Sequence, residues 1–326
     1  WYQTQSTGVM QQVTPVVAAY PVVYQLRTEY STAAQALKGA MRGIGCDRKA
    51  IINITKQHNF LQREQIAIEF QRQYGRSLRD ELQRELYFNL QKLIMGAYNN
   101  RYDFWAGAIW NGIQDCGLKP NRLISAIILM SDLDFPYVQQ AFLRRFGKDL
   151  YQTVVQSIPH RDWALLLPAW MKAQNNVMYD PTMVATELYN AARGAGTDED
   201  TFVRYLCSCH PDCFRQAVLI FQQMYGKTLR QVISNEFSLS SKYAFLLAHD
   251  YLVNPAEAVA FCLYQAMYGA GTDDESLISA TVLFSDYFRG PIIKTAYRQF
   301  GDLVYAVKTD LTGKYEDAVL GLWGLQ

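Results

Sequence analysis

The chain has no long apolar run, no cluster of basic residues and few histidines, and each absence narrows the possibilities. No apolar stretch approaches the roughly 20 residues that a membrane-spanning helix needs, so no transmembrane segment is expected. The chain carries 31 Lys and Arg against 30 Asp and Glu, for a formal net charge of +1. Without a basic run, binding to nucleic acid has little electrostatic support. Binding to an anionic membrane would need a switch that adds positive charge locally.

Patterns typical of catalysis are also missing. The chain has 4 histidines, and none lies in a nucleophile or metal motif such as G-x-S-x-G or H-E-x-x-H. We interpret His249 as a cation at a helix end, beside an exposed acid at Asp250. The sequence therefore predicts that the protein is not an enzyme.

The 6 cysteines form no obvious disulfide framework, and we expect reduced thiols, the default in the cytosol. Only the segment 207–213, which holds Cys207, Cys209, Cys213 and His210, is dense enough to suggest a metal. Zinc usually takes four ligands from two separated pairs, whereas these candidates lie on one short stretch. We therefore predict no zinc site there.

The chain does contain one glycine-rich loop three times, with a degraded fourth copy. The clear copies read MRGIGCD at 41–47, RGAGTD at 193–198 and YGAGTD at 268–273. The second glycine of each copy is followed, at one constant spacing, by an aromatic residue and a glycine, and the same spacing from Gly117 finds the fourth copy. The four pairs are Tyr74-Gly75, Phe146-Gly147, Tyr225-Gly226 and Phe300-Gly301. A period of roughly 75 residues over almost the whole chain indicates a repeat protein.

An acid follows the loop at a fixed distance in three of the four repeats. The equivalent positions, counted from a leucine behind each aromatic-glycine pair, are Glu85, Ser157, Glu236 and Asp310. The second repeat has lost both features, because its loop reads DCGL at 115–118 and its acid is replaced by serine. Loss of the loop and the acid together is what a shared ligand site would produce.

The loop and the acid together offer oxygen ligands. Glycines allow positive φ, which turns backbone carbonyls toward one point with no Cβ in the way. Several carbonyls and a bidentate carboxylate suit Ca²⁺, which takes six to eight oxygen ligands at about 2.3–2.6 Å, and they leave positions for water or an external anion. The alternative is that Gly-x-Gly only ends a helix and that the acid is ordinary surface. Three copies with matched spacing favour the calcium site.

A helix is expected to start directly after each loop. Thr197 and Thr272 fit the N-cap of a capping box with an acid three residues on, whereas the first copy, with Cys46 in this place, is a poorer cap. We therefore interpret Asp198 and Asp273 as charges at helix N-termini and not as metal ligands.

Apolar residues at helical spacing predict an all-α chain. Each repeat has a stripe of residues four apart that ends at the aromatic-glycine pair, whose glycine is expected to cap the helix. The stripes are Ile66, Phe70 and Tyr74; Val138, Phe142 and Phe146; Ala217, Phe221 and Tyr225; and Ile292, Ala296 and Phe300. With short connections, each repeat has room for about five helices. The predicted segments are a tail at 1–27 and repeats at 28–98, 99–178, 179–253 and 254–326.

These repeats resemble the annexins. The resemblance is carried by M-x-G-x-G-x-D at 41–47, R-G-A-G-T-D-E at 193–199, Y-G-A-G-T-D-D at 268–274 and the downstream acids, and it covers about residues 28–326. It implies four repeats of five α-helices that form a curved disc. It also implies that Ca²⁺ binds in loops on the convex face and bridges to acidic phospholipid head groups.

The resemblance implies three calcium sites, each built from three backbone carbonyls and one acid. The implied ligands are Met41, Gly43, Gly45 and Glu85; Ala192, Gly194, Gly196 and Glu236; and Met267, Gly269, Gly271 and Asp310. The first repeat keeps its glycines but departs at Cys46 and Arg48, where annexins usually have Thr and Glu. The second repeat departs throughout, and no site is expected there.

The chain also departs from the family in a second feature. Annexins commonly place an arginine at the end of the second helix of a repeat. The equivalent stretches here, around His58, Ser131, His210 and Ser285, lack it. The chain is therefore similar to divergent members of the family such as the alpha-giardins.

The implied function is calcium-dependent binding to acidic phospholipid membranes, as a peripheral membrane switch or scaffold. Calcium would supply the positive charge that the nearly neutral chain lacks. The apolar stretch 13–24 contains two prolines and no preceding basic segment, so we expect no signal peptide and a cytoplasmic protein that joins the membrane when calcium is present. The alternative is a cytoskeleton-associated adaptor in which calcium is secondary.

Overall fold

The computed structural model of the chain is built from α-helices. It describes residues 26–43, 45–114, 118–158, 163–194 and 196–326. Within these ranges it has twenty α-helices, and no strand beyond an isolated bridge between Val177 and Cys209. No helix in this part of the chain is long and apolar enough to cross a membrane.

The helices follow one another in four groups of five, one group for each repeat. The first group is α1 (Leu26–Ala40), α2 (Arg48–Gln57), α3 (Phe60–Tyr74), α4 (Leu78–Glu85) and α5 (Phe88–Ala97). The second is α6 (Arg101–Gln114), α7 (Pro120–Ile128), α8 (Phe135–Phe146), α9 (Leu150–Ser157) and α10 (Trp163–Trp170). The third is α11 (Pro181–Ala191), α12 (Glu199–Ser208), α13 (Pro211–Tyr225), α14 (Leu229–Glu236) and α15 (Leu239–Val253). The fourth is α16 (Pro255–Met267), α17 (Asp274–Phe284), α18 (Pro291–Tyr297), α19 (Leu303–Asp310) and α20 (Gly313–Leu322), with a 3₁₀ turn at Arg298–Phe300.

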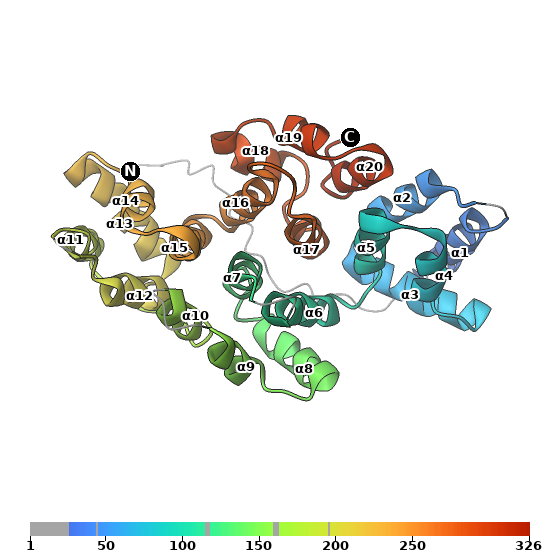
Figure 1. Cartoon of the computed structure of the whole chain (residues 1–326), viewed down its shortest axis with the longest axis horizontal. Helices are drawn as coiled ribbons and strands as arrows, with labels where there is room; N and C mark the ends of the chain where they lie inside the picture. The colour runs from blue at the N-terminus through green and yellow to red at the C-terminus, as the bar shows by residue number, and fades with distance from the viewer. Residues whose placement is uncertain (1–25, 44, 115–117, 159–162, 195) are drawn as a thin grey trace, which may run out of the picture.

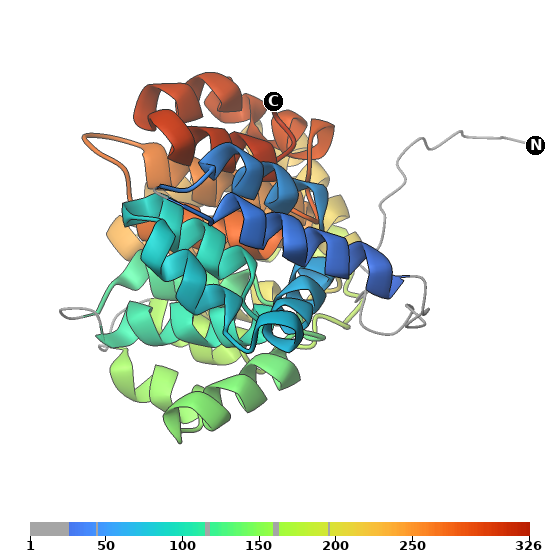
Figure 2. The ribbon, with the colours of Figure 1, turned by 90° about the vertical axis from the view of Figure 1, so that its right-hand side faces the viewer.

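The four groups lie around a common centre (Figure 1). The first group lies on the right, the second below the centre, the third on the left and the fourth above. Turned by 90°, the first group faces the viewer, with helices of the fourth above it and of the second below it (Figure 2). Between the first and fourth groups, α2 contacts α20, and α5 contacts α17 and α20. Between the second and third groups, α7 contacts α15, and α10 contacts α12 and α15. The expected all-α disc of four five-helix repeats is therefore confirmed.

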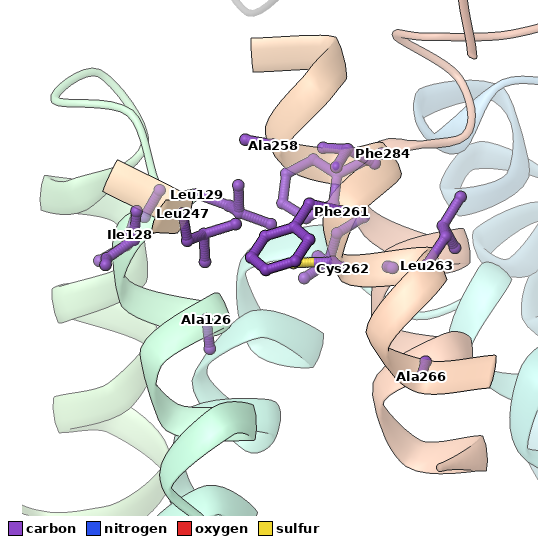
Figure 3. Packing of buried hydrophobic residues seen from close by; sticks show 14 of the residues in the cluster. Ala126, Ile128, Leu129, Leu247, Ala258, Phe261, Cys262, Leu263, Ala266 and Phe284 are labelled. Carbon is purple, nitrogen blue, oxygen red and sulfur yellow. The ribbon is translucent and has the colours of Figure 1, made fainter. Parts of the chain in front are cut away.

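Apolar side chains join the repeats at the centre. Figure 3 shows Phe261 of α16 and Phe284 of α17 near Leu129, which follows α7, and Leu247 of α15, and all four are buried. Close packing of this kind makes a domain interior resist deformation. The loops between helices are consequently carried on a scaffold in which second, third and fourth repeats share one core.

Three of the four predicted helix ends are confirmed. Gly75, Gly147 and Gly226 end α3, α8 and α13 with φ of 65°, 65° and 66°, the left-handed conformation that glycine adopts without strain. The first two residues of each predicted stripe before them are buried, as expected for the core face of a helix.

The fourth repeat differs from this prediction. Gly301 has a φ of 118° and follows the 3₁₀ turn, and Ile292, predicted to lie in the core, is 45% exposed, whereas Ile293 is fully buried. Residues three apart lie above one another in a 3₁₀ turn. Phe300 consequently packs on Tyr297, with 5.6 Å between ring centroids, and the buried stripe moves by one residue.

Candidate metal-binding loops

The glycine loops have the backbone conformation that the sequence predicted. Both glycines of each loop have φ between 84° and 138°; they are Gly43, Gly45, Gly194, Gly196, Gly269 and Gly271. A Cβ added at any of them would meet nothing within 4 Å. Glycine is required here by the backbone conformation and not by lack of space, because residues with a Cβ rarely adopt such φ values.

One hydrogen bond closes every loop in the same way. The N–H of Asp47 donates to the carbonyl of Ala40 at 2.8 Å, and the equivalent bonds are Asp198 to Ala191 at 2.9 Å and Asp273 to Ala266 at 2.7 Å. The second repeat keeps this bond, from Lys119 to Gly112 at 2.8 Å, although its loop sequence is degraded. Closure of the loop therefore belongs to the fold, and it persists where the first glycine of the pair and the acid have been lost.

The helix after each loop is capped one residue later than predicted. Asp47, Asp198 and Asp273 are the N-caps, and each carboxylate accepts the backbone N–H three residues on. The predicted capping box with Thr197 or Thr272 at the N-cap is thus wrong, and the first loop is capped as well as the others. The aspartates satisfy N–H groups that a helix start leaves without intrahelical partners.

The threonines displaced from the cap contact the downstream acid instead. Thr197 Oγ1 donates to Glu236 Oε2 at 3.1 Å, and Thr272 Oγ1 donates to Asp310 Oδ2 at 3.1 Å. The structure thus brings loop and acid together in the third and fourth repeats, although they lie far apart in sequence. Sequence reasoning missed this contact; the threonine that follows the second glycine in both copies was its only signal.

The first repeat makes a weaker version of the contact. Cys46 Sγ donates to the backbone carbonyl of Glu85 at 3.3 Å, so the loop touches the chain at the acid but not its carboxylate. In the second repeat, Ser157 donates to Thr153 within its own helix at 2.7 Å. The loop residues 115–117 of that repeat lie outside the described residues. In the described part of the chain, the third and fourth repeats therefore have a threonine-carboxylate contact, the first has a contact to the backbone of the acid, and the second has neither.

The predicted carbonyl ligands stand at equivalent places in their loops. Met41, Ala192 and Met267 lie where the preceding helix ends, and the paired glycines follow them. Among the described residues, none donates a hydrogen bond to the carbonyls of these three residues or of the six loop glycines. Carbonyl oxygens without a protein donor, beside one carboxylate, are a donor set of hard oxygens that fits Ca²⁺.

The cysteine-histidine segment takes part in packing and capping. Cys209 and Cys213 are buried, and Cys213 Sγ donates to the carbonyl of Tyr179 at 3.2 Å. His210 is the N-cap of α13, and burial raises the pKa of the Cys207 thiol to about 12. No group of three or more His, Cys, Asp or Glu side chains within the described ranges could hold a metal ion.

The interpretation of His249 and Asp250 was wrong about exposure. Both residues are buried, and the Asp250 carboxylate accepts two hydrogen bonds from Arg230 Nε, at 2.9 and 3.1 Å, and one from Nη2 at 2.9 Å. Burial of a carboxylate is tolerated when a cation and hydrogen bonds compensate it. No local pattern indicates that Arg230, on the neighbouring helix α14, supplies this partner.

Comparison with known proteins finds similar sequences and folds. A family model described as Annexin matches residues 32–97 and 183–247. Annexin A7 of Dictyostelium discoideum is 28% identical over 297 residues, which cover 89% of this chain but only 64% of that protein. Annexin A4 of Bos taurus is 27% identical, with 89% of this chain and 93% of that protein covered.

Solved structures agree in fold. A structure of annexin A8 superposes with a TM-score of 0.81 at 25% identity and covers 94% of this chain and 97% of that chain. A calcium-bound alpha-1 giardin superposes with a TM-score of 0.82 at 21% identity and covers 91% of this chain and 100% of that chain.

The disc of four five-helix repeats, each with a closed loop after its first helix, is therefore the fold of these solved structures. The match to the family model, the similar relatives and the shared fold together support a divergent member of the annexin family. Annexins generally bind phospholipids in a calcium-dependent way and are generally without enzymatic activity.

Proposed function

We propose that the first, third and fourth repeats bind Ca²⁺ through their loop carbonyls and downstream acids, and that the protein thereby binds acidic phospholipid membranes. The ligands would be those expected from the sequence, with Glu85, Glu236 and Asp310 as the carboxylates. The observation that supports this most is the hydrogen bond from the loop threonine to the acid in the third and fourth repeats. It holds the acid at the loop, where its second oxygen can face the carbonyls.

The loops would act as an electrostatic switch. Carbonyl dipoles and a carboxylate directed at one point repel the phosphate of a lipid head group as long as no cation lies between them. Bound Ca²⁺ would supply positive charge and coordination positions that the loop oxygens leave open. The chain itself is nearly neutral, so it brings little membrane attraction of its own.

Several such loops on one rigid body would act together. One carboxylate per site makes each site weak by itself, because affinity rises with the number of charged ligands. Binding of one loop to a membrane raises the effective concentration of the others at the same surface. A cytoplasmic location, with membrane association when calcium rises, follows from this proposal. The role as a cytoskeletal adaptor stays a prediction.

Co-sedimentation with phosphatidylserine vesicles tests the proposal. The parent should pellet with millimolar calcium and stay in solution with chelator, while Glu236→Ala combined with Asp310→Ala should stay in solution in both. Ser157→Ala is the matched control, because it changes the equivalent position of the repeat without an acid, and it should pellet like the parent. If the double variant pellets with calcium to the same extent as the parent, Glu236 and Asp310 are not calcium ligands and the assignment is contradicted.

A further inference from the structure

Three repeats place a left-handed residue three positions after the acid. These residues are Phe88 with a φ of 54°, Leu239 with a φ of 47° and Gly313 with a φ of 66°, and each begins the next helix. Glycine in the fourth repeat is the residue that this backbone favours. Phenylalanine and leucine at the same place are strained, since bulky residues with a Cβ rarely adopt positive φ. The equivalent residue of the second repeat, His160, lies outside the described residues.

Burial does not offset this strain. Phe88 is 88% exposed and Leu239 is 84% exposed, and among the large hydrophobic residues that the structure describes no others are as exposed. Tyr87, directly before Phe88, is 59% exposed as well. Two apolar side chains therefore project into water from a backbone conformation that disfavours them. Strained residues persist where the surroundings over-determine them, and they gather at functional sites.

Both side chains lie beside a proposed calcium loop. Consecutive Cα atoms are 3.80 Å apart, so the Cα of Phe88 is at most about 11 Å from that of Glu85, and the same bound joins Leu239 to Glu236. The loops contact the chain at these acids, through Cys46 in the first repeat and Thr197 in the third. A broad surface that meets the loops therefore lies within reach of Phe88 and Leu239 as well.

We propose that Phe88 and Leu239 are membrane-insertion residues, which enter the interface and outer acyl region of an acidic phospholipid bilayer when the calcium loops dock. This inference rests on the proposed function. Apolar side chains gain free energy on leaving water, and an aromatic ring suits the boundary between head groups and acyl chains. The exposed position then has a purpose, because the apolar surface is buried only in the bound state.

A lipid surface fits these two residues better than a protein partner does. Helices α5 and α15, which begin with them, lie on opposite sides of the centre (Figure 1). Separate single projections do not form the contiguous apolar patch that marks a protein interface. A fluid bilayer accepts each projection without a matching pocket. Insertion would also supplement the first repeat, whose loop has the weakest contact to its acid among the three proposed sites.

Substitution by glycine gives opposite changes in stability and binding. Phe88→Gly and Leu239→Gly should each raise the thermal midpoint by about 1–3 °C, since glycine removes the backbone strain. Each should weaken calcium-dependent partitioning into phosphatidylserine vesicles by about tenfold, because one apolar side chain no longer leaves water. Leu219→Ala is the control, because this leucine, 61% exposed in the middle of α13, lies outside the loops.

The fourth repeat offers the reverse experiment. A Cβ at Gly313 would meet nothing within 4 Å, so a side chain has room there. Gly313→Leu should lower the thermal midpoint and tighten calcium-dependent binding to the same vesicles, again by about tenfold. A side chain that served only to pack the protein would not show this inverse relation.

Insertion itself can be measured with Phe88→Trp and lipids brominated on the acyl chain. With calcium, the additional tryptophan fluorescence over the parent should be quenched, and with chelator it should not. If the parent fails to pellet with calcium, the proposed function fails. If the parent pellets but the glycine variants bind equally well and the tryptophan is not quenched, the proposed function stands and the insertion is overturned.

Discussion

The second and third repeats share a closed loop but differ in what the loop presents. In both, the residue just before the second helix of the repeat donates a backbone hydrogen bond to the end of the first helix. This residue is Lys119 in the second repeat and Asp198 in the third. Only the third repeat adds two glycines with positive φ and a threonine that holds Glu236. The closed loop of the repeat therefore does not require the paired glycines or the acid, and we propose that these residues are kept for calcium binding.

The largest expected effect comes from removing one negative charge. Glu236→Gln keeps the size of the side chain and an acceptor for Thr197, but it removes the charge that a hard cation needs. We expect the calcium affinity of the third loop to fall at least about tenfold, with no change in thermal midpoint. Calcium titration in the presence of phosphatidylserine vesicles measures this. Equal calcium affinity in the variant and the parent would mean that the acid, which the third repeat has and the second lacks, does not contribute to calcium binding.

Backbone conformation gives the next effect. Gly196→Ala forces a Cβ onto a φ of 138° and should lower the free energy of unfolding by about 1–3 kcal/mol, as well as weakening calcium binding. Gly39→Ala is the matched control, because Gly39 lies inside α1 with no positive φ and open space around it. There alanine should stabilise by about 0.5–1 kcal/mol. Urea denaturation compares the two, and equal effects would contradict the conformational argument.

The contact between loop and acid can be transferred between repeats. Thr197→Val removes the donor to Glu236 at nearly constant volume, and Cys46→Thr supplies a hydroxyl in the first repeat. The first change should weaken calcium-dependent vesicle binding about threefold, and the second should strengthen it by a similar factor, since a hydrogen bond of this kind contributes about 0.5–1.5 kcal/mol. Opposite or absent shifts would mean that the threonine does not position the acid.

The smallest effect concerns a contact between repeats. Burial favours the neutral form of Asp273, but hydrogen bonds from Arg122 and Ser276 outweigh it and hold the pKa of this carboxyl below its usual 3.8. A lowered pKa stabilises the folded state above pH 3.8, and this contribution is lost as the pH falls through the lower, folded value.

Arg122→Met should therefore lower the free energy of unfolding at pH 7 by about 0.5–1 kcal/mol, a modest figure because solvent screens this partly exposed pair. The difference from the parent should vanish below the folded pKa. Urea denaturation at several pH values checks this, and a difference that persists in acid would point to lost packing.

The sequence predicted the repeat, its helices and the residues of each loop, because these depend on local spacing. The N-caps after the loops, the buried stripe before Phe300 and the exposure of Asp250 were predicted wrongly. The N-caps and the burial of Asp250 depend on contacts between separate elements, such as Thr197 with Glu236 and Arg230 with Asp250, whereas the shifted stripe follows from the 3₁₀ turn at Arg298–Phe300. Local patterns identify which residues a loop offers, but they do not reveal which partner takes a hydroxyl or a charge.

The most direct test of the calcium loops is to count the ions that each acid retains. Equilibrium dialysis with radioactive calcium and phosphatidylserine vesicles should show one fewer ion per chain for Glu236→Ala and one fewer for Asp310→Ala. Ser157→Ala should leave the number unchanged. An equal number of bound ions in the parent and the two acid variants would contradict the account.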